Sequence, residues 1–484
     1  MSKSLIEMLP DVISHGKREV EKISQCVKIS LETNEYILPA EKNDKNTNWF
    51  NRLIHGDNLF AMRALLNGDS DTGLPSLRGK IDLIYIDPPF DSKADYQRKI
   101  TLPDGDVETI TLKQFAYSDI WVDGTIGYLK MLYPRLVLMK ELLSERGSIY
   151  VHCDWHAGHY LKIILDDIFG KENFVNEIVW SYKSGGVSKN TFARKHDTIF
   201  FYKKNPDKAI FNVLKEKSYN RGLKPYRFKG VEEFEDDFGW YTLVNCKDVW
   251  DIDMVGRSSG ERVDYATQKP EKLLERIIMA STYSDSIVAD FFGGSGTTAV
   301  VAEKLGRRWI TSDVGWPSCV IMRKRLIDIP ECRPFICNSI NKDCSLDRMP
   351  QICDNNSFPK LAVKKPTVTR AYDDTHETLN IELDNYLLPD NLLLDTKSNT
   401  VVQKIMKKSP LDMVEYWSVD PDYNGQNFRS IWQNYRGNTR KGKNLLRVIH
   451  DAHIVVQKTH RPRKICIKAI DIFGFESMTV LDLP

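Results

Sequence analysis

A run of six residues, Ile81 to Ile86, is rich in branched and aromatic side chains and is followed at once by Asp87-Pro88-Pro89-Phe90. This composition predicts a strand of a parallel sheet that is buried on both faces. The two prolines end the strand, because a proline cannot donate a hydrogen bond to a neighbouring strand. The sequence therefore places a carboxylate, a rigid turn and an aromatic ring at the carboxyl end of a strand, which is where open α/β sheets bind ligands.

These four residues have a chemistry that suits attack by a nucleobase amino group. The lone pair of an exocyclic amino nitrogen is delocalised into the ring, so the nitrogen is a poor nucleophile. Asp87 can accept one amino hydrogen and the Pro88 carbonyl the other, which frees the lone pair for attack on a methyl group, while Phe90 stacks on the base. An ordinary turn at the end of a strand is the alternative for the tetrapeptide taken alone. We predict Asp87, Pro88, Pro89 and Phe90 as catalytic residues.

A second strand-like run, Ile287–Asp290, is followed by a glycine-rich turn, Phe291–Thr298, and a helical stretch. Glycine lets a chain turn tightly and approach a bound cofactor closely. The next predicted strand ends in Asp313, about 20 residues after Asp290, near the place of the ribose-binding acid in a nucleotide-binding βαβ unit. The spacing Gly-x-Gly-x-x-Gly of dinucleotide-binding proteins is absent, which argues against NAD.

Predicted strands and helices alternate over most of the chain. This pattern is typical of a doubly wound α/β fold, a Rossmann-like parallel sheet with helices on both faces. Further segments that show it are the strands Arg52–His55, Ser148–Asp154 and Phe174–Trp180 and the helix Gly158–Phe169.

Polar residues stand at the ends of two of these predicted strands. Asp57 follows the first one and either offers its carboxylate to a nucleoside or caps the next helix. His152 and Asp154 end another strand and either line a target-base pocket or are ordinary core residues.

The composition changes at Ser181. From Ser181 to Lys229 there are thirteen lysines and arginines and three acids, in a chain whose net charge is only +2. A solvated charged face is the alternative for such a run, but basic residues interleaved with aromatics favour binding of nucleic acid. The candidate DNA-binding residues are Lys183, Lys189, Arg194, Lys195, Lys203, Arg221, Lys224 and Arg227.

The 484 residues predict several domains. Residues 91–124 are polar with scattered aromatics and predict a long, strand-poor loop beside the carboxyl end of a strand. The last part of the chain alternates in hydropathy and predicts a small all-β sandwich, similar to immunoglobulin-like accessory domains. We expect it to fold alone and to be dispensable for chemistry. The predicted units are an N-terminal helical extension at 1–50, the α/β domain at 51–330 with a target-recognition insert at about 181–260, a linker at 331–370 and a C-terminal β-sandwich at 371–484.

The remaining composition bears on location and metals. No apolar run reaches the ~18 residues that cross a membrane, and the first residues show no signal-peptide pattern, so we expect a cytoplasmic protein. The nine cysteines are scattered and odd in number, which fits reduced thiols. Four of them cluster but lack the closely spaced pair that zinc sites usually contain, so no metal site is predicted. These four are Cys332, Cys337, Cys344 and Cys353.

Taken together, these motifs resemble the β-class, permuted amino-methyltransferases of DNA, which include the modification subunits of type III restriction systems. The resemblance extends from about Arg52 to Asp328, with the catalytic motif first, the recognition region next and the cofactor motif last. Phe292-x-Gly294-x-Gly296 matches the family's S-adenosylmethionine motif. Gln268-Lys269-Pro270 is similar to its cofactor-side helix, and Gly56-Asp57 to its adenine-side acid.

The resemblance implies a fold, a cofactor and a reaction. We expect a methyltransferase that uses S-adenosylmethionine to modify N6 of a flipped-out adenine, because position 87 is aspartate rather than serine. It implies double-stranded DNA and a restriction or other defence-system subunit as partners in a prokaryotic cell, and it leaves a homodimer open. The alternatives are N4-cytosine methylation and a non-catalytic specificity subunit. The expected cofactor-binding residues are Asp57, Gln268, Lys269, Pro270, Asp290, Phe292, Gly294, Gly296, Thr297 and Asp313.

Overall fold

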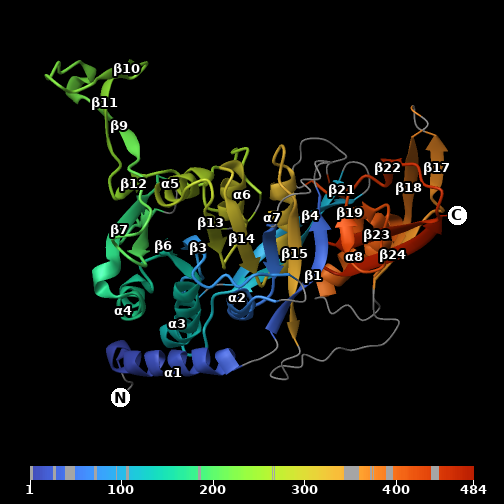
Figure 1. Ribbon diagram of the computed structural model, residues 1–484, viewed down its shortest axis with the longest axis horizontal. Coiled ribbons are helices and arrows are strands. Elements are labelled where there is room, and N and C mark those ends of the chain that lie inside the picture. Colours follow the sequence, from blue (N-terminus) through green and yellow to red (C-terminus); the bar gives the residue numbers. More distant parts are fainter. Residues whose placement is uncertain are drawn as a thin grey trace.

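The computed structural model shows a large mixed sheet covered by helices, a small sheet that projects from one end and a β-rich region at the other (Figure 1). It describes every residue except 1–3, 26–28, 39–48, 70–72, 94, 105–107, 184–186, 264, 266, 343–358, 371–372, 374, 389–395, 438–445 and 484.

Within the described residues, the main sheet has the strand order β12-β7-β8-β6-β3-β13-β14-β2-β15-β1-β20. The six strands from β6 to β15 are parallel, and β8 runs antiparallel to β6. The parallel strands are β2 (Asn51–His55), β3 (Ile81–Ile86), β6 (Leu143–Cys153), β13 (Ile287–Asp290), β14 (Arg308–Asp313) and β15 (Phe335–Lys342). The flanking strands are β1 (Ile29–Ile37), β7 (Phe174–Ser181), β8 (His196–Lys203), β12 (Val249–Asp251) and β20 (Phe428–Ser430).

Helices cover both faces of this sheet, as predicted for a doubly wound fold (Figure 1). One face shares its buried core with α1 (Leu5–Gln25), α2 (Asn58–Asn67), α3 (Thr125–Leu142) and α4 (Gly158–Phe169). The other face packs against α5 (Glu271–Ser281), α6 (Thr297–Lys304) and α7 (Trp316–Ile327). The core strand β3 is buried at all six positions, which is why its sequence shows no alternation of polar and apolar residues.

The ends of the main sheet differ from the sequence-based boundaries. The N-terminal extension at 1–50 is not only helical, because β1 pairs antiparallel with β15. The predicted linker at 331–370 is wrong, because β15 is a core strand of the main sheet and two further strands follow it. Those two are β16 (Lys360–Val363) and β17 (Thr367–Arg370). The cysteine cluster yields no metal site among the described residues, and Cys344 and Cys353 lie outside them.

The target-recognition region contains a small sheet of its own. Its strands are β9 (Lys215–Tyr219), β10 (Phe234–Asp236) and β11 (Gly239–Asn245), in the order β10-β11-β9. This sheet stands clear of the body at the upper left of Figure 1. The chain then returns through β12, which pairs parallel to β7.

Residues 91–124 do not form a strand-poor loop. They contain a long antiparallel hairpin, β4 (Asp95–Asp104) and β5 (Glu108–Ser118). Its side chains Ile100, Leu102 and Leu112 are buried in the core of the C-terminal region. The sequence predicts a loop here because threonine and charged residues surround these few apolar positions, whose burial depends on a distant partner.

The C-terminal region consists of two antiparallel sheets that share one core with α8 (Thr396–Lys408). It is therefore not all-β, and an immunoglobulin-like topology stays a prediction. Besides β16 and β17, the first sheet contains β18 (His376–Leu387) and β22 (Asp451–Gln457). The second contains β19 (Val414–Asp420), β21 (Trp432–Tyr435), β23 (Arg463–Asp471) and β24 (Glu476–Leu483).

This region is not a separate unit. Its strand β20 pairs with β1 of the main sheet. Beside that joint, buried Arg323 of α7 donates to Glu35 of β1 and, at 2.7 Å, to the hydroxyl of Tyr416 in β19. Lys468 of β23 lies 3.4 Å from the same Glu35 carboxylate. We expected a domain that folds alone, whereas the structure joins it to the catalytic sheet by backbone pairing and buried charge.

None of the helices in the described part of the chain combines the length and the apolar character needed to cross a bilayer.

Candidate active site

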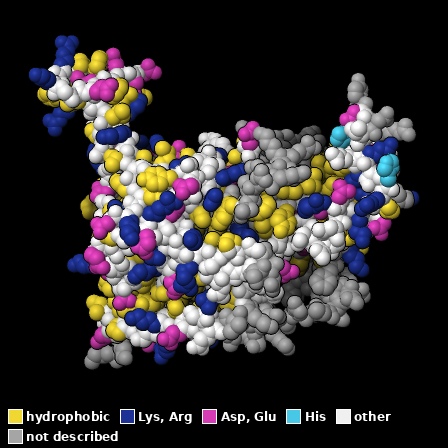
Figure 2. All heavy atoms as spheres, in the orientation of Figure 1, with side chains coloured by type: hydrophobic (Ala, Val, Ile, Leu, Met, Phe, Trp, Pro, Cys, Tyr) yellow, Lys and Arg dark blue, Asp and Glu magenta, His cyan; other side chains and the backbone are white. Residues whose placement is uncertain are grey.

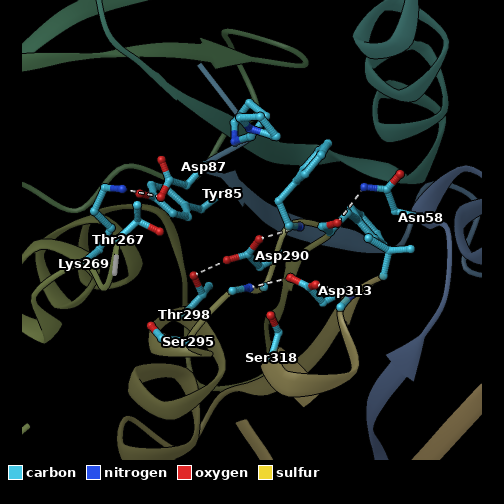
Figure 3. A pocket seen from close by; sticks show the side chains of 18 of the residues that line it. Asn58, Tyr85, Asp87, Thr267, Lys269, Asp290, Ser295, Thr298, Asp313 and Ser318 are labelled. Atoms are coloured by element: carbon cyan, nitrogen blue, oxygen red, sulfur yellow. Dashed lines mark hydrogen bonds and ion pairs between the residues drawn. The ribbon is translucent and has the colours of Figure 1, made fainter. Parts of the chain in front are cut away.

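A cavity of about 290 Å³ opens at the carboxyl ends of β2, β3, β13 and β14. Its walls bring together Asp57, Asp87, Asp290 and Asp313, one acid from the end of each of these strands. Parallel strands end at the same edge of a sheet, so residues far apart in the chain meet here. Figure 3 shows Asp290 and Asp313 side by side, with Asp87 farther along the same cavity.

Asp87 is held from two sides. Its Oδ2 accepts a hydrogen bond from Lys269 Nζ, and this ammonium group also lies 5.5 Å from the centre of the Phe90 ring. The other oxygen, Oδ1, lies 3.8 Å from His152 Nδ1 and accepts no hydrogen bond from the described residues. Asp87 therefore has unfilled capacity as an acceptor. Pro88, Pro89 and Phe90 line the same cavity.

His152 is a buried residue behind Asp87. Its Nδ1 lies 2.8 Å from the hydroxyl of Tyr85, and its Nε2 lies 3.3 Å from Asp197 Oδ2. The imidazole also packs against Phe90, with 5.6 Å between the ring centres. His152 thus supports the acid and the aromatic ring of the catalytic tetrapeptide from behind. Asp154 does not line the cavity but accepts hydrogen bonds from His156.

The glycine turn is fixed by the two acids at its sides. Asp290 accepts hydrogen bonds from the Phe292 amide at 3.0 Å and from Thr298 Oγ1 at 2.5 Å. Asp313 accepts the Gly294 amide at 2.8 Å. Gly294 has a φ of 53°, in the left-handed region that glycine adopts without strain. The two acids therefore fix the backbone conformation of the turn beside the cavity.

Burial raises the pKa of both acids. It raises the pKa of Asp290 to about 7, although the hydrogen bonds from Thr298 and Phe292 oppose the shift. Burial likewise raises the pKa of Asp313 to about 6, against hydrogen bonds from the Gly315 and Gly294 amides. An ionised carboxylate is disfavoured away from water, so both groups are poised to titrate near neutral pH.

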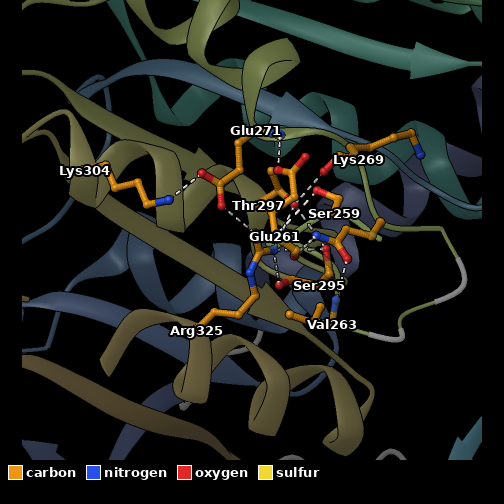
Figure 4. A network of polar contacts seen from close by, with 10 residues as sticks. Ser259, Glu261, Val263, Lys269, Glu271, Ser295, Thr297, Lys304 and Arg325 are labelled. Carbon is orange, nitrogen blue, oxygen red and sulfur yellow. Dashed lines mark hydrogen bonds and ion pairs between the residues drawn. The ribbon is translucent and has the colours of Figure 1, made fainter. Parts of the chain in front are cut away.

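The segment after the insert is braced by a polar network (Figure 4). Arg325 of α7 donates to the Ser295 carbonyl at 2.9 Å and to Thr297 Oγ1 at 3.0 Å. Thr297 Oγ1 in turn donates to the Lys269 carbonyl at 3.0 Å, and Glu271 pairs with Arg325. The network ties the glycine turn to the residue that holds Asp87.

Three expected cofactor-binding residues do not line the cavity. Gln268 is buried and donates to the Glu261 carbonyl while accepting the Val263 amide, so it shapes the preceding segment. Pro270 precedes the first turn of α5. Gly296 lets the chain pass α7, since an added Cβ would lie 2.4 Å from Met322. The other expected residues, namely Asp57, Lys269, Asp290, Phe292, Gly294, Thr297 and Asp313, do line it.

Asp57 caps the next helix, one of the two roles that the sequence left open, and its carboxylate also lines the cavity. Its Oδ1 accepts the Leu59 amide at 2.8 Å as the N-cap of α2, and Arg135 of α3 donates to the same oxygen at 2.7 Å. Arg135 also donates to Asn58, which bonds the Phe291 carbonyl. Arg135 and Asn58 line the cavity but were not predicted. Only the packing of α3 against α2 brings this arginine to the site.

The remaining lining residues that were not predicted come from loops and from helices and strands of the main sheet. They include Asp119 and Trp121 after the hairpin, Tyr265 and Thr267 before α5, and Ser318 of α7. Thr267 and Tyr265 lie within three residues of Gln268, so a search around that motif would have found them. Asp119 has no sequence signal, because its role depends on the fold of the hairpin before it.

The candidate DNA-binding residues lie in three parts of the structure. Lys183, Lys189, Arg194 and Lys195 lie between β7 and β8, at the edge where the cavity opens, and Arg194 stacks 3.8 Å from the Trp155 ring centre. Arg221, Lys224 and Arg227 are exposed on the projecting sheet region. Lys203 is the last residue of β8 and pairs with Ser148, so it lies away from the strand ends at which the cavity opens, and its contact with DNA stays a prediction.

Comparison with known proteins gives relatives for this arrangement. A probable type III restriction-modification enzyme, the HindVI Mod subunit of Haemophilus influenzae, is 32% identical over 185 residues, which is 37% of this chain and 21% of that subunit. The type II methyltransferase M.BamHI of Bacillus amyloliquefaciens is 28% identical over 324 residues, which is 66% of each chain. The chain thus spans about a fifth of the first relative and two thirds of the second.

Solved structures also match, at low scores. The M1.HpyAVI–SAM complex is 20% identical, with 57% of this chain and 98% of that chain covered and a TM-score of 0.35. The cytosine-N4-specific PvuII DNA methyltransferase is 17% identical, with 58% and 87% covered and a TM-score of 0.37. These scores are too low to support a structural conclusion.

A family model matches half of this chain. Residues 81–323 match the family model described as DNA methylase. They run from the first residue of β3 into α7 and so include the insert and the two turns, Asp87–Phe90 and Phe291–Thr298, that meet at one cavity. The chain belongs to the DNA methylase family.

Proposed function

We propose that the protein transfers a methyl group from S-adenosylmethionine to N6 of an adenine flipped out of double-stranded DNA. The observation that carries the proposal is a single cavity that joins the Asp87–Phe90 turn to the glycine turn. One end has the groups for holding an amino nitrogen, and the other has the groups for holding a nucleoside. Membership of the DNA methylase family supports the same reaction.

The glycine-turn end fits S-adenosylmethionine. Asp313, at the end of β14, offers acceptors to ribose hydroxyls, as the corresponding acid does in nucleotide-binding βαβ units. Gly294 has a φ of 53° and no side chain, so no side chain at this position fills the space at the turn. Asp57 and Arg135 at the far wall supply an acceptor and a cation for the polar groups of the cofactor.

The Asp87 end fits an amino group attached to a flat ring. With Oδ2 held by Lys269, the carboxylate stays in place and keeps capacity for an amino hydrogen at Oδ1. The Pro88 carbonyl is the second acceptor. Phe90 presents its ring to the same cavity, where an extruded base can stack.

These residues act on the amino group rather than on the methyl donor. S-adenosylmethionine, when bound, supplies an activated methyl group. Asp87 and Pro88 accept the two amino hydrogens, which localises the nitrogen lone pair and directs it along the cavity toward the glycine turn. Phe90 holds the ring plane, and its contact with His152 keeps the aromatic ring from turning away. The interactions with the amino group stabilise mainly the transition state, in which the nitrogen becomes tetrahedral.

The proposed path for DNA lies along the cavity edge and the projecting sheet. Figure 2 shows lysine and arginine side chains gathered at the outer end of the projecting sheet, with apolar side chains between them. Exposed aromatic surface is added by Phe192 in the segment between β7 and β8 and by Phe228 in the projecting sheet region. Basic residues would neutralise phosphates while the insert at 181–260 reads the sequence.

The cellular setting is also a proposal. Both relatives reported above are named as restriction-modification enzymes or type II methyltransferases. We therefore place this protein in a restriction-modification or related defence system, where a restriction subunit would be its partner.

The test is to identify the product. The full chain is incubated with plasmid DNA and labelled S-adenosylmethionine, and the digested nucleosides are separated by mass spectrometry. We expect N6-methyladenine from the wild type and none from Asp87→Ala. N4-methylcytosine as the sole product would refute the choice of base. Absence of any methylated base, with bound cofactor and bound DNA, would refute catalysis and favour a specificity subunit.

A further inference from the structure

The peptide that follows Phe90 is held by one buried carboxylate. Asp119 Oδ2 accepts the Phe90 amide at 3.0 Å and the Ser92 amide at 2.7 Å, and its Oδ1 accepts the Asp91 amide at 3.0 Å. The same Oδ1 accepts Trp121 Nε1 at 3.1 Å. Asp119 is 1% exposed, so its carboxylate makes these hydrogen bonds away from water, where they are electrostatically stronger.

The bonds hold a backbone conformation that is unfavourable by itself. Asp91 and Lys93 have φ values of 59° and 58°, in the left-handed region that residues other than glycine rarely adopt. Thr125 donates to the Asp91 carboxylate at 2.6 Å and adds a further restraint. Removing the acceptor therefore lets the segment relax away from this shape, and Phe90 moves with it.

Asp119 is placed by the hairpin that precedes it. The segment held by Asp119 leads directly into β4, and Asp119 directly follows β5. Among the described residues these two strands pair with each other and with no other strand. Both ends of the hairpin are thus at the catalytic turn, and its position depends on what holds the far end.

The far end of the hairpin is embedded in the C-terminal region. Ile100, Leu102 and Leu112 belong to its buried core. Asp104 forms ion pairs with Lys404 and, at 3.2 Å, with Lys408 of α8. The C-terminal region is itself fixed to the main sheet through β20 and Arg323. The hairpin is therefore a strut between the C-terminal region and the catalytic turn.

We propose that Asp119 is a positioning residue for the catalytic turn and that the C-terminal region holds it in place through the β4–β5 hairpin. This inference rests on the proposed methyl transfer. It gives the C-terminal region a part in catalysis although every residue that would touch base or cofactor comes from the first 320 positions. It predicts that loosening either end of the strut slows transfer while cofactor binding stays the same, because the glycine turn has its own supports.

The near end is tested with Asp119→Asn in the full chain. The amide group replaces one acceptor oxygen by a donor that faces backbone N–H groups, with little change of volume. We expect kcat to fall at least tenfold and the affinity for S-adenosylmethionine to stay within twofold. Hydrogen exchange of the peptide that contains Phe90–Ser92 should become at least tenfold faster. Exchange and kcat equal to those of the wild type would overturn the positioning role.

The far end is tested with Lys404→Ala combined with Lys408→Ala. These two lysines are on the surface, 300 and 304 positions after Asp104 in the sequence. They do not line the cavity. We expect kcat to fall severalfold and the Phe90–Ser92 amides to exchange faster, with unchanged cofactor affinity. Lys407→Ala is the control, because it removes a lysine charge from the same helix and, in the described structure, is not one of the ion-pair partners of Asp104.

The outcomes separate this inference from the proposed function. Wild-type protein that methylates no base refutes the function, while amide exchange still reports on the strut. If Lys404→Ala with Lys408→Ala matches Lys407→Ala in exchange and in kcat, the C-terminal region does not hold the turn. If cofactor affinity falls together with kcat in every variant, the hairpin supports the whole fold rather than the catalytic turn, and the inference is wrong.

Discussion

The glycine turn and the catalytic turn lie at the same edge of one sheet but are held in different ways. The glycine turn is fixed by Asp290 and Asp313, acids that end its own strand and the neighbouring one. The catalytic turn is fixed by Asp119, which reaches it at the end of a hairpin embedded in the C-terminal region. Under the proposed function, cofactor binding would be a local property of the α/β domain, whereas the turn proposed for catalysis is held by a distant part of the chain.

The largest effect should come from the catalytic turn itself. Asp87→Ala removes the carboxylate that holds the amino group, so we expect methyl transfer to fall by about 10²- to 10⁴-fold, the range for loss of a positioned acid–base group. Cofactor affinity, measured by calorimetry, should change little because the glycine turn is intact. Transfer near the wild-type rate would contradict the assignment.

The joint between the two regions is the next target. Glu35→Ala removes the carboxylate shared by buried Arg323 and Lys468, and of these two only Lys468 keeps a carboxylate partner, Glu476. Breaking a buried ion pair in this way costs about 3–5 kcal/mol, so the free energy of unfolding should fall by that amount in a denaturant titration. Glu32→Ala on the exposed face of β1 is the control and should change it by less than about 0.5 kcal/mol. Equal stability of the two variants would show that the joint is held by other contacts.

The glycine turn is probed by Asp313→Ala, with Gly294→Val as a second variant. The first removes the proposed ribose acceptor, and hydrogen bonds to a charged group contribute about 1.5–3 kcal/mol, so the dissociation constant for S-adenosylmethionine should rise roughly 10- to 150-fold. The second places a branched residue at a φ of 53° and fills the turn. Unchanged cofactor affinity in both variants would place the cofactor elsewhere.

The pH dependence of cofactor binding sharpens the same point. The pKa of Asp313 is raised by burial to about 6, so the free protein gains a proton there as the pH falls below 6. A protonated carboxyl accepts ribose hydroxyls poorly, so affinity should be full at pH 8 and about tenfold weaker at pH 5. Asp313→Asn should bind weakly at both values. An equal pH dependence in that variant would assign the titration to Asp290 or another group.

The smallest expected effect concerns DNA. Arg221→Ala with Lys224→Ala removes two exposed cations from the projecting sheet region. If both contact phosphates, the slope of log affinity against log salt should flatten by about 2, at ~0.9 for each contact. Lys203→Ala lies at the opposite edge of the main sheet and should leave the slope unchanged. The reverse result would move the DNA to the other edge.

The sequence-based predictions of secondary structure were wrong in segments whose structure depends on long-range contacts. The hairpin at 95–118 was expected as a loop, because its few apolar residues are buried only by the C-terminal region. The stretch at 335–342 was expected as a linker, because its place beside β2 is set by a parallel pairing across the whole domain. Asp119 and Arg135 reach the cavity from elements whose own sequences carry no motif.

The sequence by itself determined the strands that are buried on both faces, the turns that follow them and the acids at their ends. These are local properties: proline ends a strand at Asp87, and glycine permits the turn at Gly294, whatever surrounds them. Only the tertiary structure decided that the two turns share a cavity and that Lys203 lies away from the sheet edge at which this cavity opens. It also decided that a hairpin connects the turn at Asp87–Phe90 to the C-terminal region. The physical reason is that strand order, register and the burial of sparse apolar residues depend on partners that lie far away in the chain.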